Sequence, residues 1–250
     1  MSDYFDPLVA PFTWRGTIGE SVVMVHGFTG TAAHFRLLGR FLNDRQYTTI
    51  APLLAGHGTS MAEMAQTDND DWLASVRVTT ESALAENDRV HLVGLSLGGL
   101  LSVLIADELP VTSVTTINAP IRFKNARTYA SPLLSRITPM ISWPEAPPPP
   151  LADEAKPLWL TYSGFPTKAL ADLVTTSRMA LEAASRVRIA SLTIQSKADA
   201  TVKPISGRLL ADALGPRNRL VWLERSIQNS LLDGERDIIH HAVLDRIRSA

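Results

Sequence analysis

The feature that most constrains the fold is a glycine-rich segment between an apolar strand and an apolar helix. It reads Gly94-Leu95-Ser96-Leu97-Gly98-Gly99, follows the run RVHLVGL and opens the run LGGLLSVLIA. A strand that turns directly into a helix strains the backbone of the serine, and glycines two positions before and after it remove side chains that would collide. The hydroxyl then projects beside the N–H groups of the first helical turn. The position of the motif between strand and helix predicts a nucleophilic Ser96. The motif by itself would also fit a glycine-rich turn whose serine has no catalytic role.

Short β-branched runs alternate with segments of helical periodicity along most of the chain. This alternation is typical of a parallel sheet with helices on both faces. The expected strands are 21–26, 48–51, 89–95, 113–118, 189–195 and 219–223. The expected helices are 32–42, 70–84, 97–109, 205–214 and 235–248. We therefore expect an α/β fold with a mainly parallel sheet.

The alternation breaks once, in a proline-rich stretch that includes the run 147–150. Helical spacing returns at 168–184, so the stretch is expected to form a small cap rather than a disordered linker. The domain prediction is a core of 1–121 and 186–250 with a cap insertion at 122–185. Within a compact domain the proline run is expected to be a rigid loop, although such runs also serve as recognition motifs.

Composition excludes several classes of partner and site. The 24 basic and 25 acidic residues are scattered, which gives no footprint for nucleic acid or for an anionic membrane surface. The chain has no cysteine, which excludes disulfides and thiolate chemistry. The first residues lack the pattern of a signal peptide, and the apolar stretch 92–106 is too short to span a bilayer. We expect a cytoplasmic protein without stable membrane insertion; the sequence gives no indication of oligomeric state.

Two further segments suit a serine nucleophile. The loop His26-Gly27-Phe28-Thr29-Gly30 follows the first buried strand, where its glycines would let a backbone N–H face a substrate. The N–H groups of Phe28 and Leu97 are therefore the candidate oxyanion hole, with His26 and His57 expected to brace loops. Asp199 follows a later strand in the segment QSKADATVKP, and the order of serine then aspartate matches the triad order of α/β-hydrolases.

Taken together, the motifs resemble the compact bacterial carboxylesterases and monoacylglycerol lipases of the α/β-hydrolase fold. The resemblance covers nearly the whole chain and is weak only at about 122–165. The matching stretches are HGFTGT, LLAGHGTS, DDWLASV, VHLVGLSLGG, INAPI, SRMALEAASRVRIASLTIQSKAD and WLERS with LLDGERD. It implies that Ser96 is the nucleophile, that Asp199 orients a histidine base, and that this base stands at position 228.

Position 228 departs from the pattern because the loop reads ERSIQNSLLD and holds Gln228. A glutamine amide can fill the space of an imidazole and hydrogen-bond Ser96 or Asp199, but it cannot accept the serine proton near neutral pH. The later histidines, His240 and His241, lie on the expected last helix and are not expected to replace it. The intact frame around the loop favours a single substitution of histidine in a working esterase.

Two functions remain open at this point. The first is a serine carboxylesterase or lipase that hydrolyses short-chain esters or monoacylglycerols through an acyl-Ser96 intermediate, impaired here by Gln228. The second is a non-catalytic small-molecule binder that retains the pocket. The expected ligand is a small apolar ester, and no cofactor or metal is implied. The apolar cap residues would suit an acyl pocket or serve as ordinary cap core, and they are Trp143, Trp159, Tyr162 and Phe165.

Overall fold

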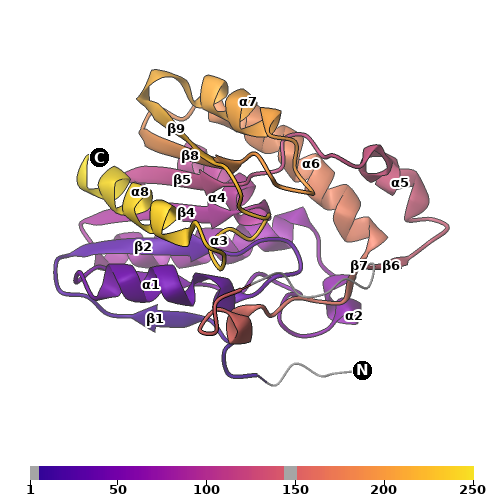
Figure 1. Ribbon diagram of the computed structural model, residues 1–250, viewed down its shortest axis with the longest axis horizontal. Helices are drawn as coiled ribbons and strands as arrows, with labels where there is room; N and C mark the ends of the chain where they lie inside the picture. Colours follow the sequence, from indigo (N-terminus) through magenta and orange to yellow (C-terminus); the bar gives the residue numbers. More distant parts are fainter. Residues whose placement is uncertain (1–5, 144–150) are drawn as a thin grey trace.

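A seven-stranded sheet crosses the computed structural model, which describes residues 6–143 and 151–250 (Figure 1). The strand order is β1-β3-β2-β4-β5-β8-β9, and only β1 at the edge runs antiparallel to its neighbour. The strands are β1 Phe12–Trp14, β2 Glu20–Val25, β3 Thr48–Ala51, β4 Arg89–Leu95, β5 Ser113–Ile117, β8 Ala190–Ser196 and β9 Asn218–Leu223. The predicted α/β-hydrolase fold class is confirmed.

Helices cover both faces of the sheet because its central strands are apolar on both sides. On β2, Val22 and Met24 join the cluster of α1 (Arg36–Asn43) and α8 (Arg236–Arg248). The alternate side chains Val23 and Val25 join the cluster on the opposite face. That second cluster is packed by α3 (Asn69–Glu86), α4 (Leu97–Glu108), α6 (Thr167–Ala184) and α7 (Ile205–Leu214).

All expected strands and helices are present, with ends shifted by a few residues. The expected helix at 32–42 divides into a 3₁₀ turn, Ala32–Phe35, followed by α1. The structure adds the edge strand β1 and the single-turn helix α2, Met61–Met64. In the described residues, no helix is both long enough and apolar enough to cross a membrane.

The stretch predicted as a cap contains short elements followed by one long helix. These are two 3₁₀ turns, Ala126–Ala130 and Lys156–Leu158, then α5 Ser131–Leu134 and the antiparallel pair β6 Met140–Ser142 with β7 Gly164–Pro166. Helix α6 shares an apolar cluster with α4 through Leu173 and Ala180. The boundaries 122–185 stay a prediction of domain organisation, and the proline run 147–150 lies outside the described residues.

Candidate functional site

Ser96 occupies a strained turn between β4 and α4. Its backbone has φ 54° and ψ −119°, a conformation that costs free energy in any residue other than glycine. A Cβ at Gly94 would lie 2.1 Å from the Gly98 oxygen, and one at Gly98 would lie 2.0 Å from the Val25 oxygen. Both glycines of the motif are therefore required by backbone packing, as the sequence predicted.

The loop after β2 lies directly against Ser96. A Cβ placed on Gly27 would be 3.1 Å from the Ser96 Cβ atom, so Phe28 follows immediately beside the serine. The Leu97 N–H is at the first position of α4 and has no acceptor within the helix. Among residues 6–143 and 151–250, neither the Phe28 nor the Leu97 N–H is engaged in a backbone hydrogen bond. Two free N–H donors thus flank the serine, which is the arrangement an oxyanion hole requires.

Two buried histidines brace the loops beneath Phe28. His26 Nδ1 donates to the Gly27 oxygen over 3.0 Å, and its Nε2 accepts from the Leu54 N–H over 3.1 Å. His57 Nδ1 lies 3.0 Å from the Ala55 oxygen. Burial lowers the pKa of His57 to about 4 and the pKa of His26 well below its ordinary value, so both rings are neutral. They fix the loops, as predicted, and carry no positive charge at neutral pH.

Asp199 is completely buried in the turn after β8. Its Oδ1 accepts from the N–H groups of Thr201 (2.7 Å) and Val202 (2.9 Å). Its Oδ2 has no hydrogen-bond partner among the described residues. Burial raises the pKa of the Asp199 carboxyl to about 6, although both backbone donors and the charge of Lys124 act in the opposite direction. One carboxylate oxygen is thus held firmly while the other lacks a donor.

Gln228 does not bridge Ser96 and Asp199 in the structure. Its Nε2 donates to the Asn118 oxygen over 3.1 Å, and its Oε1 is buried without a partner among the described residues. Of the hydrogen bonds that a glutamine at this position could make, the structure shows one to the backbone after β5 and none to Ser96 or Asp199. His240 and His241 contact Phe41 of α1, at ring distances of 5.0 and 5.4 Å.

Asn118, which follows β5, connects the two loops that carry Asp199 and Gln228. It has a left-handed backbone, with φ 48°. Its Oδ1 accepts from the Ser196 N–H over 2.7 Å, and its Nδ2 donates to the Gln228 oxygen over 2.9 Å and to Ser230 Oγ over 3.2 Å. Sequence reasoning missed this residue, and the only signal was an asparagine at the carboxyl end of a strand, where such side chains often cap turns.

Two carboxylates hold the loop before α8. Glu235 accepts from the N–H groups of Glu224, Arg225 and Ser226, and Asp233 accepts from the Ile227 N–H over 2.8 Å. The Ser226 oxygen in turn accepts a hydrogen bond from Ser196 Oγ. The loop at 224–230 is therefore fixed from both sides, so position 228 is defined by its backbone and not by its side chain.

Aromatic side chains from the core and the cap surround Phe28. Its ring lies 6.2 Å from Trp72 and 5.7 Å from Phe165, and Phe165 lies 4.5 Å from Trp143. Tyr162 instead binds the loop at 56–59, donating to the Gly56 oxygen and accepting from the Thr59 N–H, both over 2.9 Å. Of the cap aromatics expected beside the site, Phe165 and Trp143 form a row that leads to Phe28.

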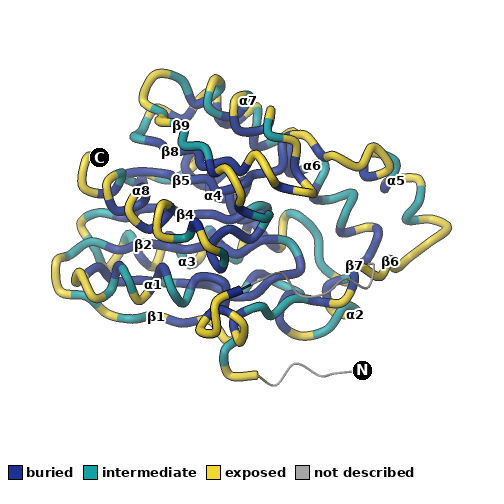
Figure 2. Tube along the Cα trace, viewed as in Figure 1, coloured by how far each residue is buried: buried dark blue, intermediate teal, exposed yellow. Residues whose placement is uncertain are grey.

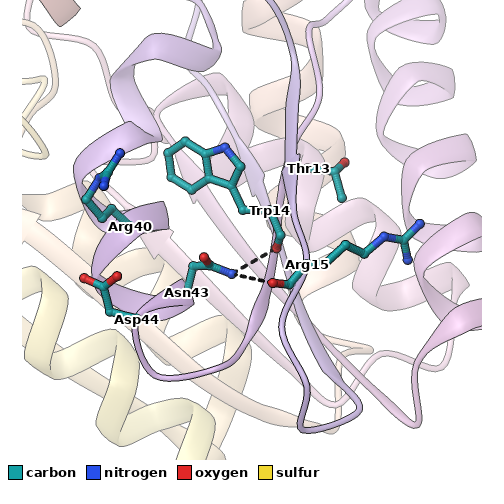
Figure 3. Close-up of a pocket in the computed structure, with 6 residues that line it drawn as sticks. All are labelled: Thr13, Trp14, Arg15, Arg40, Asn43 and Asp44. Atoms are coloured by element: carbon teal, nitrogen blue, oxygen red, sulfur yellow. Dashed lines mark hydrogen bonds between the residues drawn. The ribbon is translucent and has the colours of Figure 1, made fainter.

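A surface depression of about 420 Å³ lies elsewhere, between β1 and α1 (Figure 3). Asn43 closes this corner by donating to the Trp14 and Arg15 oxygens, and Arg40 lies over the Trp14 ring. These contacts join the edge strand to the first helix and include none of the candidate site residues. In the parts of the chain that the structure describes, no group of three or more His, Asp or Glu side chains could hold a metal ion.

Comparisons with known proteins agree with this architecture. Residues 22–244 match the model of the alpha/beta hydrolase family. The carboxylesterase of Bacillus subtilis (strain 168) is 29% identical over 237 residues, which cover 94% of each protein. The thermostable monoacylglycerol lipase of Bacillus sp. (strain H-257) is 35% identical over 108 residues, 43% of this chain and 42% of that protein.

Solved structures show the same likeness. A structure from work on LipS and LipT, two metagenome-derived lipolytic enzymes, has a TM-score of 0.88 at 28% identity and covers 98% of this chain and 99% of that one. The monoacylglycerol lipase of Paleococcus ferrophilus has the same fold, with a TM-score of 0.77 at 18% identity over 94% of this chain and 96% of that one. The resemblance predicted from the motifs is confirmed, and the chain belongs to the alpha/beta hydrolase family.

Proposed function

We propose that this chain is a serine carboxylesterase or lipase scaffold whose chemistry would pass through an acyl-Ser96 intermediate. The observation that carries the proposal is the strained backbone of Ser96 beside the free N–H groups of Phe28 and Leu97. A protein has no structural reason to retain such strain, so the conformation points to an exposed nucleophile. The carboxylesterase and lipase names of the relatives support the same reaction class.

The substrates would be short-chain esters or monoacylglycerols. The row of Phe28, Phe165 and Trp143 offers apolar surface next to the serine and suits an acyl chain. Ser96 Oγ would attack the ester carbonyl carbon, and the Phe28 and Leu97 N–H groups would stabilise the oxyanion. The alcohol would leave, and water would then release the acid from Ser96.

Catalysis by this chain would be weak because both steps need a base. Gln228 has no nitrogen that titrates near neutral pH, and its amide is directed to Asn118. Asp199 also differs from the aspartate of an intact triad, because its Oδ2 atom has no imidazole to accept a hydrogen bond from. In a serine protease, loss of the base costs about 10⁶ in turnover, and binding with the oxyanion hole leaves a small residual rate.

The decisive test is the Gln228→His variant, assayed with a chromogenic short-chain ester. We expect kcat/KM to rise by about 10³-fold or more, because the imidazole would accept the Ser96 proton and donate to Asp199 Oδ2. Ser96→Ala in the Gln228→His background is the matched control and should abolish the gain. A Gln228→His protein that is folded and as inert as the native chain would refute the proposal.

A non-catalytic small-molecule binder is the second candidate. The hydrogen bond from Gln228 Nε2 to the Asn118 oxygen favours it, because that contact holds the amide nitrogen in a position with no role in proton transfer. A binder would take up an unreactive ester analogue with equal affinity in the native chain and in Ser96→Ala. It would also show no gain of turnover in Gln228→His, which separates it from the esterase proposal.

A further inference from the structure

Exposed apolar side chains are concentrated in the first part of the predicted cap. Nine large apolar side chains are exposed in the described residues, and five of them lie at 129–143. Ile137 is 82% exposed and Leu133 is 69% exposed. The full set is Tyr129, Leu133, Ile137, Met140 and Trp143. Five of nine exposed large apolar side chains within fifteen consecutive residues is a local concentration of the kind that marks an interaction surface.

The first part of the predicted cap, residues 122–143 (called the segment below), is basic, although the chain as a whole is not. Between 109 and 144 there is no aspartate or glutamate, while the formal net charge of the chain is −1. None of the segment's cations forms an ion pair with a residue that the structure describes, and all are exposed; they are Arg122, Lys124, Arg127 and Arg136. The whole-chain balance conceals this local excess of positive charge.

The segment also lies next to the candidate site. It protrudes beyond α6 at the edge of the molecule and is largely exposed (Figure 2). Its last described residue, Trp143, contacts Phe165, and Phe165 contacts Phe28 beside Ser96. A ligand bound to the segment would therefore contact the row of Trp143, Phe165 and Phe28, which leads to Ser96.

We propose that residues 122–143 form a docking surface for an anionic lipid bilayer. Apolar side chains flanked by cations are the combination that holds a protein at the interface of such a membrane, where each cation adds attraction and each apolar group is buried among acyl chains. The docking is peripheral and inserts no helix across the membrane. Its purpose rests on the proposed function, since an acyl ester would pass from the bilayer to the Phe165 and Phe28 rings.

A second copy of the chain is a poorer occupant for this surface. In a two-fold pairing the same patch faces itself, so the unpaired cations of both copies would oppose one another. Anionic headgroups supply the missing countercharge. The charge of the segment thus favours a lipid surface over self-association.

The test is sedimentation of the native chain with vesicles of phosphatidylcholine alone or mixed equally with phosphatidylglycerol. We expect binding to the mixed vesicles only, weakened at high salt because the attraction is screened. Arg127→Gln with Arg136→Gln should lower the partition coefficient by about fivefold for each charge removed. Leu133→Ser with Ile137→Ser should lower it by about tenfold or more, because both side chains leave the interface.

Val78→Ser is the matched control, since Val78 is 66% exposed on α3 and lies outside the segment. It should bind as the native chain does, and thermal unfolding should be unchanged in all variants. The proposal is overturned if mixed vesicles do not bind, if Val78→Ser weakens binding as much as Leu133→Ser with Ile137→Ser, or if the latter instead dissolves a dimer in sedimentation velocity. Binding needs no turnover, so an inert Gln228→His variant would refute the esterase without deciding this result.

Discussion

At the scale of single residues, Asp199 is a buried carboxyl group with only one of its two oxygens hydrogen-bonded among the described residues. Its Oδ1 is satisfied by two backbone donors, whereas its buried Oδ2 meets no donor among the described residues. Burial without a full set of donors disfavours the ionised form and raises its pKa to about 6. The native state therefore holds a proton on Asp199 in a pH range where the unfolded chain has lost it, and ionisation of this group opposes folding.

We predict that Asp199→Asn stabilises the protein above pH 6. Between the ordinary aspartate pKa and about 6 the folded state binds more protons, so the contribution of Asp199 falls as pH rises through that window and stays low above it. The variant should gain about 2–3 kcal/mol at pH 8, and roughly 1 kcal/mol less at pH 5.5. Urea unfolding at both values measures this, and a gain that does not depend on pH would contradict it.

The candidate site residues that belong to local motifs could be located from the sequence, whereas a residue whose role depends on long-range contacts could not. Ser96, Leu97 and Phe28 belong to short segments whose glycines and flanking strands can be read directly from the sequence. Asn118 could not be found that way, because its role depends on Ser196 and Gln228, which are remote in sequence. The hydrogen bond of the Gln228 amide to the Asn118 oxygen could not be read from the sequence for the same reason.

At the scale of elements, the turn between β4 and α4 requires a glycine where its backbone passes close to the backbone of β2. A Cβ at Gly98, in the first turn of α4, would lie inside the contact distance of the Val25 oxygen in β2, and β2 is held in the sheet by its pairing with β3 and β4. The turn and the neighbouring strand are thus one packed unit. The backbone geometry of Ser96 is therefore fixed by β2 as well as by its own segment.

We predict that Gly98→Ala destabilises the protein by about 3 kcal/mol or more, because the added methyl group overlaps backbone that cannot relax. Gly234→Ala is the matched control, since nothing lies within 4 Å of a Cβ at that position. Differential scanning calorimetry of the two variants measures the contrast. Equal melting temperatures of the two variants would show that the turn between β4 and α4 can accommodate the added methyl group.

The longer elements were predictable because their hydrophobic periods are regular. β1 was missed since three residues are too few to show alternation, and it exists because it pairs with β3. The short elements of the cap were also missed, since β6 and β7 depend on each other across more than twenty residues. Hydrophobic periodicity identifies an element that is long enough to repeat its pattern. These three-residue strands form only because each pairs with another strand.

At the scale of the whole molecule, neutral buried histidines dominate the response to acid. Of the six histidines, burial lowers the pKa of five: His34, His57, His91 and His240 each to about 4, and His26 well below its ordinary value. The unfolded chain binds these protons below about pH 6.5. Their contribution to stability is fully present above that value and is lost as pH falls toward 4.

We predict a cooperative acid transition near pH 5. Each histidine withdraws about 2 kcal/mol of stability between pH 7 and pH 5, so the five together approach the net stability of a typical domain, about 5–15 kcal/mol. Protonation of Asp199 over the same pH range offsets only a small part of this loss of stability. Circular dichroism against pH follows the transition, and His240→Gln should shift it to lower pH. A fold that is unchanged down to pH 4 would show that the rings are not buried as neutral groups.

The anchoring of the loop at 224–230 by Glu235 and Asn118 has a consequence for biosynthesis. During translation, Ser96, Phe28, Asn118 and Asp199 all leave the ribosome before Asp233 and Glu235, the two carboxylates that hold this loop. A nascent chain that has emerged only as far as β9 contains all seven strands of the sheet, but it lacks these two carboxylates. The loop at 224–230 can therefore take its final position only after the rest of the candidate site has been synthesised.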